Sequence, residues 1–127
     1  MHRQNFVAAM MAAGLAAAAF AGAASAADAK KGETVFQRCA ICHADTKGRG
    51  NRVGPDLWGI VGRKAGTAEN FFYSPALKNS GIVWTNEKLE AYVMKPSAAV
   101  PGNRMAFGGI ADKAQADDLI AYLDTLK

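Results

Sequence analysis

The residues best suited to chemistry lie together in the segment Cys39-Ala40-Ile41-Cys42-His43. The pattern Cys-x-x-Cys-His is the attachment sequence of a c-type haem. Each thiol can add across a haem vinyl group to give a thioether, and two intervening residues on a helical turn set the sulfurs about one porphyrin edge apart. His43 follows directly, so its imidazole can point at the iron. We therefore expect one haem c, covalently attached through Cys39 and Cys42, with His43 as an iron ligand.

Other uses of a Cys-x-x-Cys pair are a thioredoxin-like redox site, part of a zinc site, and a disulfide in an exported protein. Cys39 and Cys42 are the only cysteines, and the only histidine besides His43 is His2. A structural zinc site requires four ligands, and the chain offers three if the segment that contains His2 is removed. No β-α-β alternation supports a thioredoxin site. A plain disulfide is therefore the main alternative to haem attachment.

Residues 1–26 have the pattern of a secretory signal peptide. Arg3 precedes an alanine-rich, uncharged stretch at 6–27, and the small residues Ala24-Ser25-Ala26 provide a cleavage site. The alternative is a retained membrane anchor, because the uncharged stretch is just long enough to span a bilayer. Alanine favours membrane insertion less than leucine does, so we expect cleavage after Ala26, with Ala27 as the alternative position, and no permanent membrane anchor. The mature chain, residues 27–127, would then be periplasmic, with a formal net charge of +3 instead of +4 after loss of Arg3.

The mature chain is expected to be one small all-α domain. A chain of this length buries a modest core by itself, and a covalent haem would add a large apolar body for that core to pack against. The sequence pattern predicts helices separated by glycine-rich loops, without convincing strand alternation. The longest loop is expected over residues 43–72, because helix-breaking residues are frequent there. They are Gly48, Gly50, Gly54, Pro55, Gly59, Gly62 and Gly66.

Four helices are predicted, each beginning at a residue whose side chain can accept hydrogen bonds from the first backbone N–H groups. These N-caps are Asp28, Ser74, Thr85 and Asp112. The first three helices are expected to end near Ala40, Gly81 and Pro96, respectively. The last helix is amphipathic and needs a partner, for which the first helix is available. Its apolar stripe consists of Ala116, Leu119, Ile120, Leu123 and Leu126.

A second strong axial ligand would make the haem an electron carrier instead of a site for oxygen binding or catalysis. The mature chain has no second histidine, but it has two methionines, Met94 and Met105. Met94 lies at the end of a predicted helix, where core filling is the ordinary role of a methionine. Met105 lies in a loop bracketed by proline and glycine, where a side chain is fixed by what it binds. We expect Met105 to be the sixth iron ligand.

Several further motifs occur in a fixed order around this site. They are Gly32 and Phe36 before CAICH, then Gly54-Pro55, Gly62-Arg63-Lys64, Phe72-Tyr73-Ser74, Gly81-Ile82-Val83-Trp84, Tyr92, PGNRM and Asp118-Leu119-Ile120-Ala121-Tyr122-Leu123. With these motifs the chain resembles the class I c-type cytochromes, the group of mitochondrial cytochrome c and its soluble bacterial relatives. The resemblance covers essentially the whole mature chain. It implies a small cytochrome c fold, with helices and loops wrapped around one haem.

The resemblance also assigns roles to individual residues. It implies that the Pro55 carbonyl accepts the Nδ1–H of His43, which fixes the tautomer of the ligand. It implies that the hydroxyl of Tyr92 approaches the methionine sulfur. The family's partners of the inner haem propionate are matched here by Arg63, Tyr73 and Trp84. For the aromatic residues core packing is the ordinary alternative, and both roles can hold at once.

The chain departs from the family pattern at three places. Leu77 stands where the family usually has an asparagine, which puts an internal polar network in doubt. Asn103 replaces the usual threonine two residues before the methionine, and it can still donate a hydrogen bond. Ser97-Ala98 replaces a lysine pair that docks the mitochondrial oxidase and reductase. The identity of the partners therefore does not follow from the resemblance.

The expected function is one-electron transfer through an exposed haem edge, without enzymatic activity, between respiratory or photosynthetic-type redox proteins. Basic residues near the ligand-bearing loops would favour acidic docking surfaces on such partners. They are Lys47, Arg49, Arg52, Lys95 and Arg104, and an ordinary solvated surface is the alternative. No basic-aromatic interleaving indicates nucleic-acid binding, and we expect a monomer. The rival hypotheses are a catalytic or gas-binding haem protein with a loose Met105, and a membrane-anchored subunit of a larger oxidoreductase.

Overall fold

The computed structural model describes Gly14 and residues 26–127. Five helices lie within this range, with no strand among the described residues and one isolated bridge between Lys64 and Val83. The helices are α1 (Ala29–Phe36), α2 (Pro75–Lys78), α3 (Asn86–Met94), α4 (Pro96–Ala99) and α5 (Lys113–Leu123). The expected all-α fold is confirmed. Apart from Gly14 and Ala26, the expected signal peptide 1–26 lies outside the described residues, and so does the alternative of a retained anchor.

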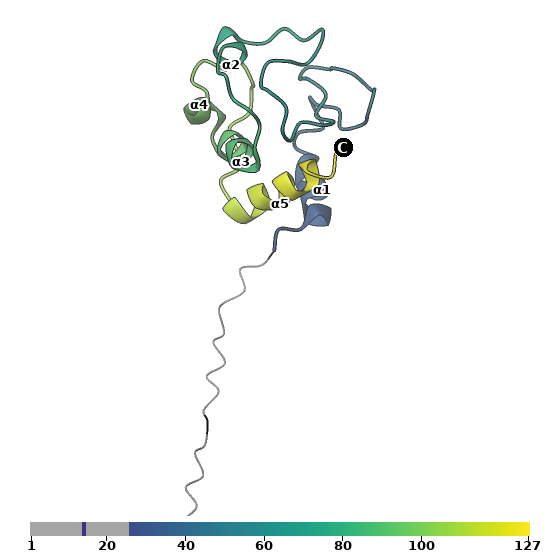
Figure 1. Ribbon diagram of the computed structural model, residues 1–127, viewed down its shortest axis with the longest axis vertical. Coiled ribbons are helices and arrows are strands. Elements are labelled where there is room, and N and C mark those ends of the chain that lie inside the picture. Colours follow the sequence, from purple (N-terminus) through teal and green to yellow (C-terminus); the bar gives the residue numbers. More distant parts are fainter. Residues whose placement is uncertain (1–13, 15–25) are drawn as a thin grey trace, which may run out of the picture.

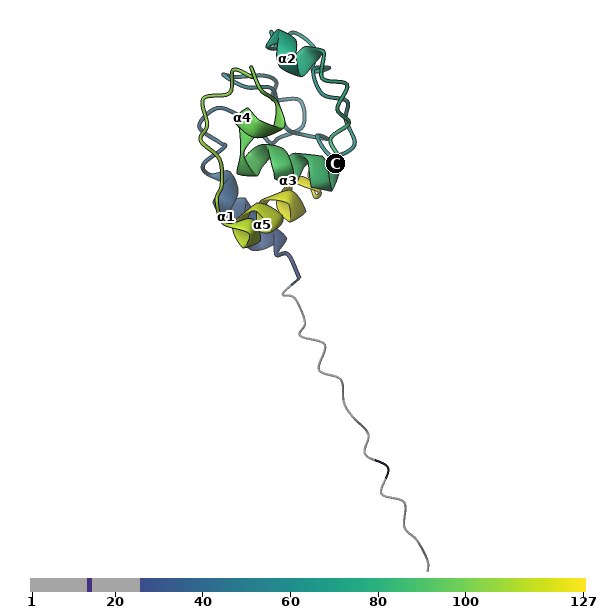
Figure 2. The ribbon, with the colours of Figure 1, turned by 90° about the vertical axis from the view of Figure 1, so that its left-hand side faces the viewer.

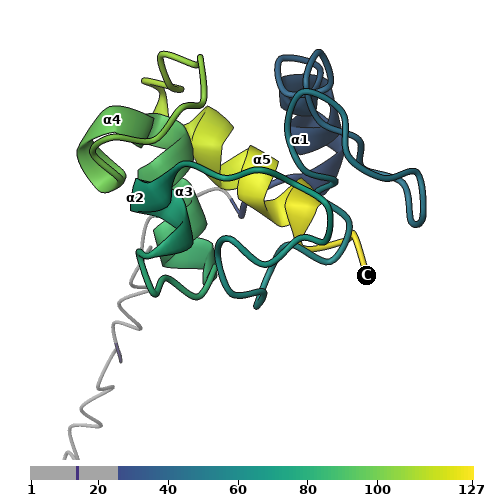
Figure 3. The ribbon, with the colours of Figure 1, turned by 90° about the horizontal axis from the view of Figure 1, so that it is seen from above.

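The first and last helices pack against each other, as the amphipathic pattern of the last helix predicted (Figures 1 and 3). They meet at Gly32, where an added Cβ would overlap the backbone carbonyl of Asp118. The rings of Phe36 and Tyr122 lie 5.4 Å apart at the same crossing. The Asp118 side chain also accepts a hydrogen bond of 2.8 Å from the backbone N–H of Asp28. The glycine is thus required by the close approach of two backbones.

The core lies between α5, α3 and the long loop. Helix α5 contacts both α1 and α3 (Figure 2). Trp84, just before α3, packs on Tyr92 of α3 with ring centroids 5.0 Å apart. Leu126 follows the end of α5 and is still buried. The expected stripe of α5 is buried together with residues from the other elements; the largest members of this core are Phe36, Ile60, Trp84, Leu89, Tyr92, Ile110, Leu119, Ile120, Leu123 and Leu126.

All four predicted N-caps accept hydrogen bonds from the first turns of their helices. The helix ends differ from the predictions at three places, the first of which is α2, which ends at Lys78 instead of near Gly81. Helix α1 ends at Phe36 instead of Ala40, and the chain continues in turns, with the N–H groups of Cys39 and Ala40 bonded to the Phe36 carbonyl. Pro96 ends α3 as predicted but also begins α4, because proline is well suited to the first turn of a helix.

Residues 43–72 contain no helix, as predicted, but the loop is held in place by backbone hydrogen bonds. Gly54 donates to the Cys42 carbonyl, and Gly59 donates to the Leu126 carbonyl at 2.7 Å. Farther along, the Trp84 N–H donates to the Arg63 carbonyl at 2.9 Å. These bonds attach the loop to the cysteine motif, to the C-terminus and to the segment before α3. The loop therefore forms one wall of the molecule's interior.

Among the described helices, none is long and apolar enough to cross a membrane.

Candidate functional site

A cavity of about 650 Å³ opens between the long loop, α3, α5 and the segment that follows α4. This volume lies in the range of cofactor sites. All nine residues that the sequence analysis named as site residues line it. They are Cys39, Cys42, His43, Pro55, Arg63, Tyr73, Trp84, Tyr92 and Met105. The fold thus gathers at one place residues that are spread over most of the mature chain.

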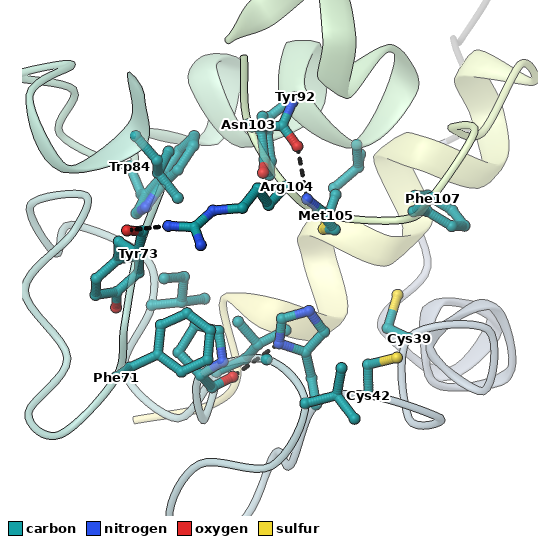
Figure 4. A pocket seen from close by; sticks show the side chains of 18 of the residues that line it. Cys39, Cys42, Phe71, Tyr73, Trp84, Tyr92, Asn103, Arg104, Met105 and Phe107 are labelled. Carbon is teal, nitrogen blue, oxygen red and sulfur yellow. Dashed lines mark hydrogen bonds between the residues drawn. The ribbon is translucent and has the colours of Figure 1, made fainter. Parts of the chain in front are cut away.

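The two cysteines lie on the same side of the cavity (Figure 4). They lie on one turn, in which the N–H groups of Cys42 and His43 both bond to the Cys39 carbonyl. Burial raises the pKa of the Cys39 thiol to about 11, against the opposing effect of the neighbouring Arg38. Redox-active Cys-x-x-Cys sites instead lower the thiol pKa to obtain a reactive thiolate. The environment of Cys39 is therefore unlike that of a thioredoxin-type site.

His43 is oriented by the backbone of the long loop. Its Nδ1 lies 2.7 Å from the Pro55 carbonyl oxygen, which can only accept, so Nδ1 carries the proton and the lone pair is on Nε2. Burial lowers the pKa of His43 below its ordinary value, although the hydrogen bond to Pro55 acts in the opposite direction. A Cβ at Gly54 would overlap the imidazole ring. The result is a neutral imidazole with a fixed tautomer, which is the form that binds metals.

Met105 is half-buried on the segment between α4 and α5, and its sulfur faces the cavity (Figure 4). Its backbone N–H donates to the side-chain oxygen of Asn103 at 2.9 Å. Tyr92 of α3 lines the same cavity, and burial raises the pKa of Tyr92 to about 12. The Tyr92 hydroxyl therefore stays protonated at neutral pH and can donate a hydrogen bond into the cavity. Met94 does not line the cavity.

Polar donors gather on the other side of the cavity from the cysteines, where Figure 4 shows Tyr73 and Trp84. The Tyr73 hydroxyl accepts a hydrogen bond of 3.0 Å from the Ala68 N–H, which leaves its own proton to donate. Arg63 donates to the carbonyls of Asp56 and Trp58 at 2.9 and 3.3 Å, and keeps further N–H groups. Such donors suit carboxylates, and the propionates of haem lie at the porphyrin edge away from the vinyl groups. The residues present thus fit a haem whose vinyl edge faces the cysteines.

The basic residues at the cavity differ from those that the sequence suggested. Of the expected set only Arg104 lines the cavity, whereas Arg38 and Lys64 line it and were missed. Three apolar side chains on its rim were missed as well, because a sequence pattern does not show which apolar residues stay exposed. Ile41, Val53 and Phe72 are 74%, 76% and 84% exposed, respectively. Arg38 directly precedes Cys39, and this was the only feature of the sequence that could have indicated its position at the cavity.

The chain is similar in sequence and in fold to known proteins. Residues 29–127 match the model of the Cytochrome c family. Cytochrome c2 of Blastochloris viridis is 48% identical over 106 residues, which are 84% of this chain and 84% of that protein. Cytochrome c of Cochliobolus lunatus is 43% identical over 98 residues, 76% of this chain and 91% of that protein. Among solved structures, cytochrome cH from Methylobacterium extorquens matches with a TM-score of 0.73 and 44% identity, covering 77% of this chain and 98% of that chain.

These similarities agree with the geometry of the site. Proteins of this family transfer electrons with a covalently bound haem c, which requires two cysteines at the spacing of Cys39 and Cys42. The cavity places both thiols on one side and the polar donors on the other. The chain therefore belongs to the cytochrome c family, as a class I c-type cytochrome that binds haem c through Cys39 and Cys42.

Proposed function

We propose that this cytochrome is a one-electron carrier whose haem iron is bound by His43 and Met105, and that it is not an enzyme. The observation that carries the proposal is that an imidazole with a free Nε2 and a thioether sulfur line the same cavity. The bound haem supplies reversible one-electron chemistry at its iron. Two strong protein ligands leave no open position for a substrate.

The surroundings of the two ligands favour a high reduction potential. A thioether is a soft, neutral ligand that stabilises ferrous iron relative to ferric iron. The cavity wall is largely apolar, and a low-polarity site disfavours the extra positive charge of the ferric centre. Buried residues such as Leu89, Leu119 and Leu123 contribute to this wall. We expect a potential in the upper part of the range of about 0.8 V that axial ligands allow.

The other site residues hold and orient the haem in this proposal. The Pro55 carbonyl fixes the tautomer of His43. Tyr92, which lines the same cavity as Met105, would donate a hydrogen bond toward the sulfur. The carboxylates of the haem are bound by the donors at the polar side of the cavity. Those donors are Arg63, Tyr73 and Trp84.

We further propose that residues 1–26 are a cleaved signal peptide and that the domain 27–127 works in the periplasm as a monomer. The pattern of residues 1–26 and the similarity to bacterial cytochromes c2 support this location. The redox partners would be proteins with acidic surfaces around their own electron-transfer sites, because basic side chains line the cavity rim. Nucleic acid is not expected as a partner. Mass spectrometry of the exported protein should show one haem and no residues 1–26; an uncleaved chain would support the anchored alternative.

Two methionine variants test the ligand assignment. Met105→Leu keeps the side-chain volume but removes the sulfur, so the haem should stay attached while its potential falls and the ferrous protein binds CO. Met94→Leu is the matched control, because Met94 does not line the cavity, and its potential should stay unchanged. Potentials are measured by redox titration of the purified holoproteins. An unchanged potential in Met105→Leu, or ready CO binding by the unaltered protein, would contradict the proposal.

A further inference from the structure

Asn103 connects the backbone at Met105 to the end of the preceding helix. Its side-chain Nδ2 donates to the carbonyls of Pro96 and Val100 at 3.0 and 2.9 Å, and its Oδ1 accepts from the Met105 N–H at 2.9 Å. Both donors and the oxygen of this amide are therefore used. Figure 4 shows the bond between Asn103 and Met105 above the cavity. A threonine hydroxyl has one donor, so it could not make the same set of bonds.

Arg104 connects the same backbone to the far side of the cavity. Its Nη2 donates to the Tyr73 carbonyl at 2.6 Å, across 31 positions of sequence. The guanidinium also lies over the ring of Phe72, 4.9 Å from its centroid. Figure 4 shows the arginine side chain extended above the cavity toward Tyr73. Both side chains are exposed, so the stacking contributes modestly and the hydrogen bond is the main link that the arginine makes between the two segments.

The chain after Met105 is also held. Ile110 donates to the Val93 carbonyl of α3 at 2.9 Å, and Gly109 approaches the Met94 carbonyl so closely that a Cβ would overlap it. The free part of the segment is therefore short. A movement of the Met105 backbone away from the cavity would have to stretch or break the bonds of Asn103, of Arg104, or of both, so with these bonds intact the sulfur can move only by rotation within its own side chain.

We propose that Asn103 and Arg104 are positioning residues that keep the Met105 sulfur on the iron and so exclude competing ligands. The inference rests on the proposed role of Met105 as the sixth ligand. Asn103 holds the chain from the α4 side, and Arg104 holds it from the side of the Tyr73 segment. The rate at which the sulfur leaves the iron is then set by the opening of these contacts, and not by the iron–sulfur bond alone.

The test measures how fast imidazole binds to the ferric holoprotein. Imidazole can bind the iron only after the sulfur has left it. The observed rate constant of imidazole binding should therefore reach a plateau as the imidazole concentration rises. Asn103→Ala removes three hydrogen bonds and should raise this plateau by about 10- to 100-fold. Arg104→Gln keeps an exposed polar side chain but loses the stacking, and should raise it by about 2- to 10-fold.

Asn51→Ala is the matched control. The Asn51 side chain also bonds to backbone on both sides, donating to the Glu69 carbonyl at 2.8 Å and accepting from the Asp56 N–H at 3.1 Å, but it is remote in sequence from Met105 and does not line the cavity. This variant should lower the midpoint of chemical unfolding and leave the plateau rate unchanged. A merely structural role of Asn103 predicts that both asparagine variants behave alike.

The outcomes separate the two proposals. A ferric wild-type protein without sulfur-to-iron charge-transfer absorption, and with an imidazole rate that rises without a plateau, would overturn Met105 ligation itself. A wild-type protein with that absorption and with a plateau that neither variant changes would overturn only the positioning role. If Asn103→Ala does not accumulate as holoprotein, the plateau rate is measured in Arg104→Gln and in Asn103→Ser, which keeps one donor. An unchanged plateau rate in both variants would then overturn the positioning role.

Discussion

Tyr122 of α5 donates a hydrogen bond to the carboxylate of Asp45, which lies two residues after His43. The two residues are 77 positions apart in the sequence. Tyr122 also packs on Phe36 of α1. This one residue of the last helix therefore contacts both the first helix and the segment that follows the cysteine motif. Through this bond the packing of α1 on α5 is connected to the position of the imidazole.

Replacing Tyr122 by phenylalanine removes the hydrogen bond but keeps the ring on Phe36. We expect the free energy of unfolding of the holoprotein to fall by about 1.5 kcal/mol, the lower end for a bond to a charged group because both partners are half-buried. Denaturant unfolding measures this change. Asp45→Asn keeps a hydrogen-bond acceptor, so it should lower the free energy of unfolding by less. If the effects of the two substitutions simply add in the double variant, the two side chains do not interact.

Stability at alkaline pH should also depend on this bond. Burial, together with the hydrogen bond and negative charge of Asp45, raises the pKa of Tyr122 above its ordinary value. The folded protein thus holds the phenolic proton more tightly than the unfolded chain does, so this stabilisation is complete below about pH 10 and is lost as the pH rises further. The free energy of unfolding of Tyr122→Phe should therefore fall less steeply above that pH. Equal slopes for both proteins would contradict the assignment.

Gly54 leaves room for the imidazole of His43. The methyl group of Gly54→Ala would overlap the imidazole ring, so the ring or the loop must shift. We expect this shift to lower the free energy of unfolding by about 1–3 kcal/mol. We expect a lower yield of holoprotein and an altered visible spectrum. Gly108→Ala is the control, because a Cβ there meets no atom within 4 Å. If both alanine variants load haem equally well and have the same spectrum, the backbone of Gly54 does not position His43.

The rim of the cavity should attract negatively charged oxidants. Neutralising Arg38 should lower the rate constant of oxidation by ferricyanide at low ionic strength by about two- to fivefold, and should weaken its dependence on salt. Lys113→Gln changes the net charge equally but affects a residue that pairs with Glu90 and Asp117 and does not line the cavity. Stopped-flow measurements across a salt series compare the two. Equal effects would mean that net charge, and not its placement, controls the reaction.

Local chemistry explains why much of the fold and site could be predicted from the sequence. The N-caps, the haem motif and the stripe of α5 depend on residues that are close in the chain, and Met105 was indicated by its loop and by the lack of a second histidine in the mature chain. Contacts across long separations could not be predicted in this way. No local pattern pairs Asp45 with Tyr122, or Arg104 with the Tyr73 carbonyl.

The bond between the Gly59 N–H and the Leu126 carbonyl has a consequence for the order of assembly. Gly59 and Leu126 are far apart in the sequence, so this bond can form only once the chain folds. We expect haem to be attached to Cys39 and Cys42 before that stage, while both thiols are accessible, and the bond then to fix the long loop around the attached group.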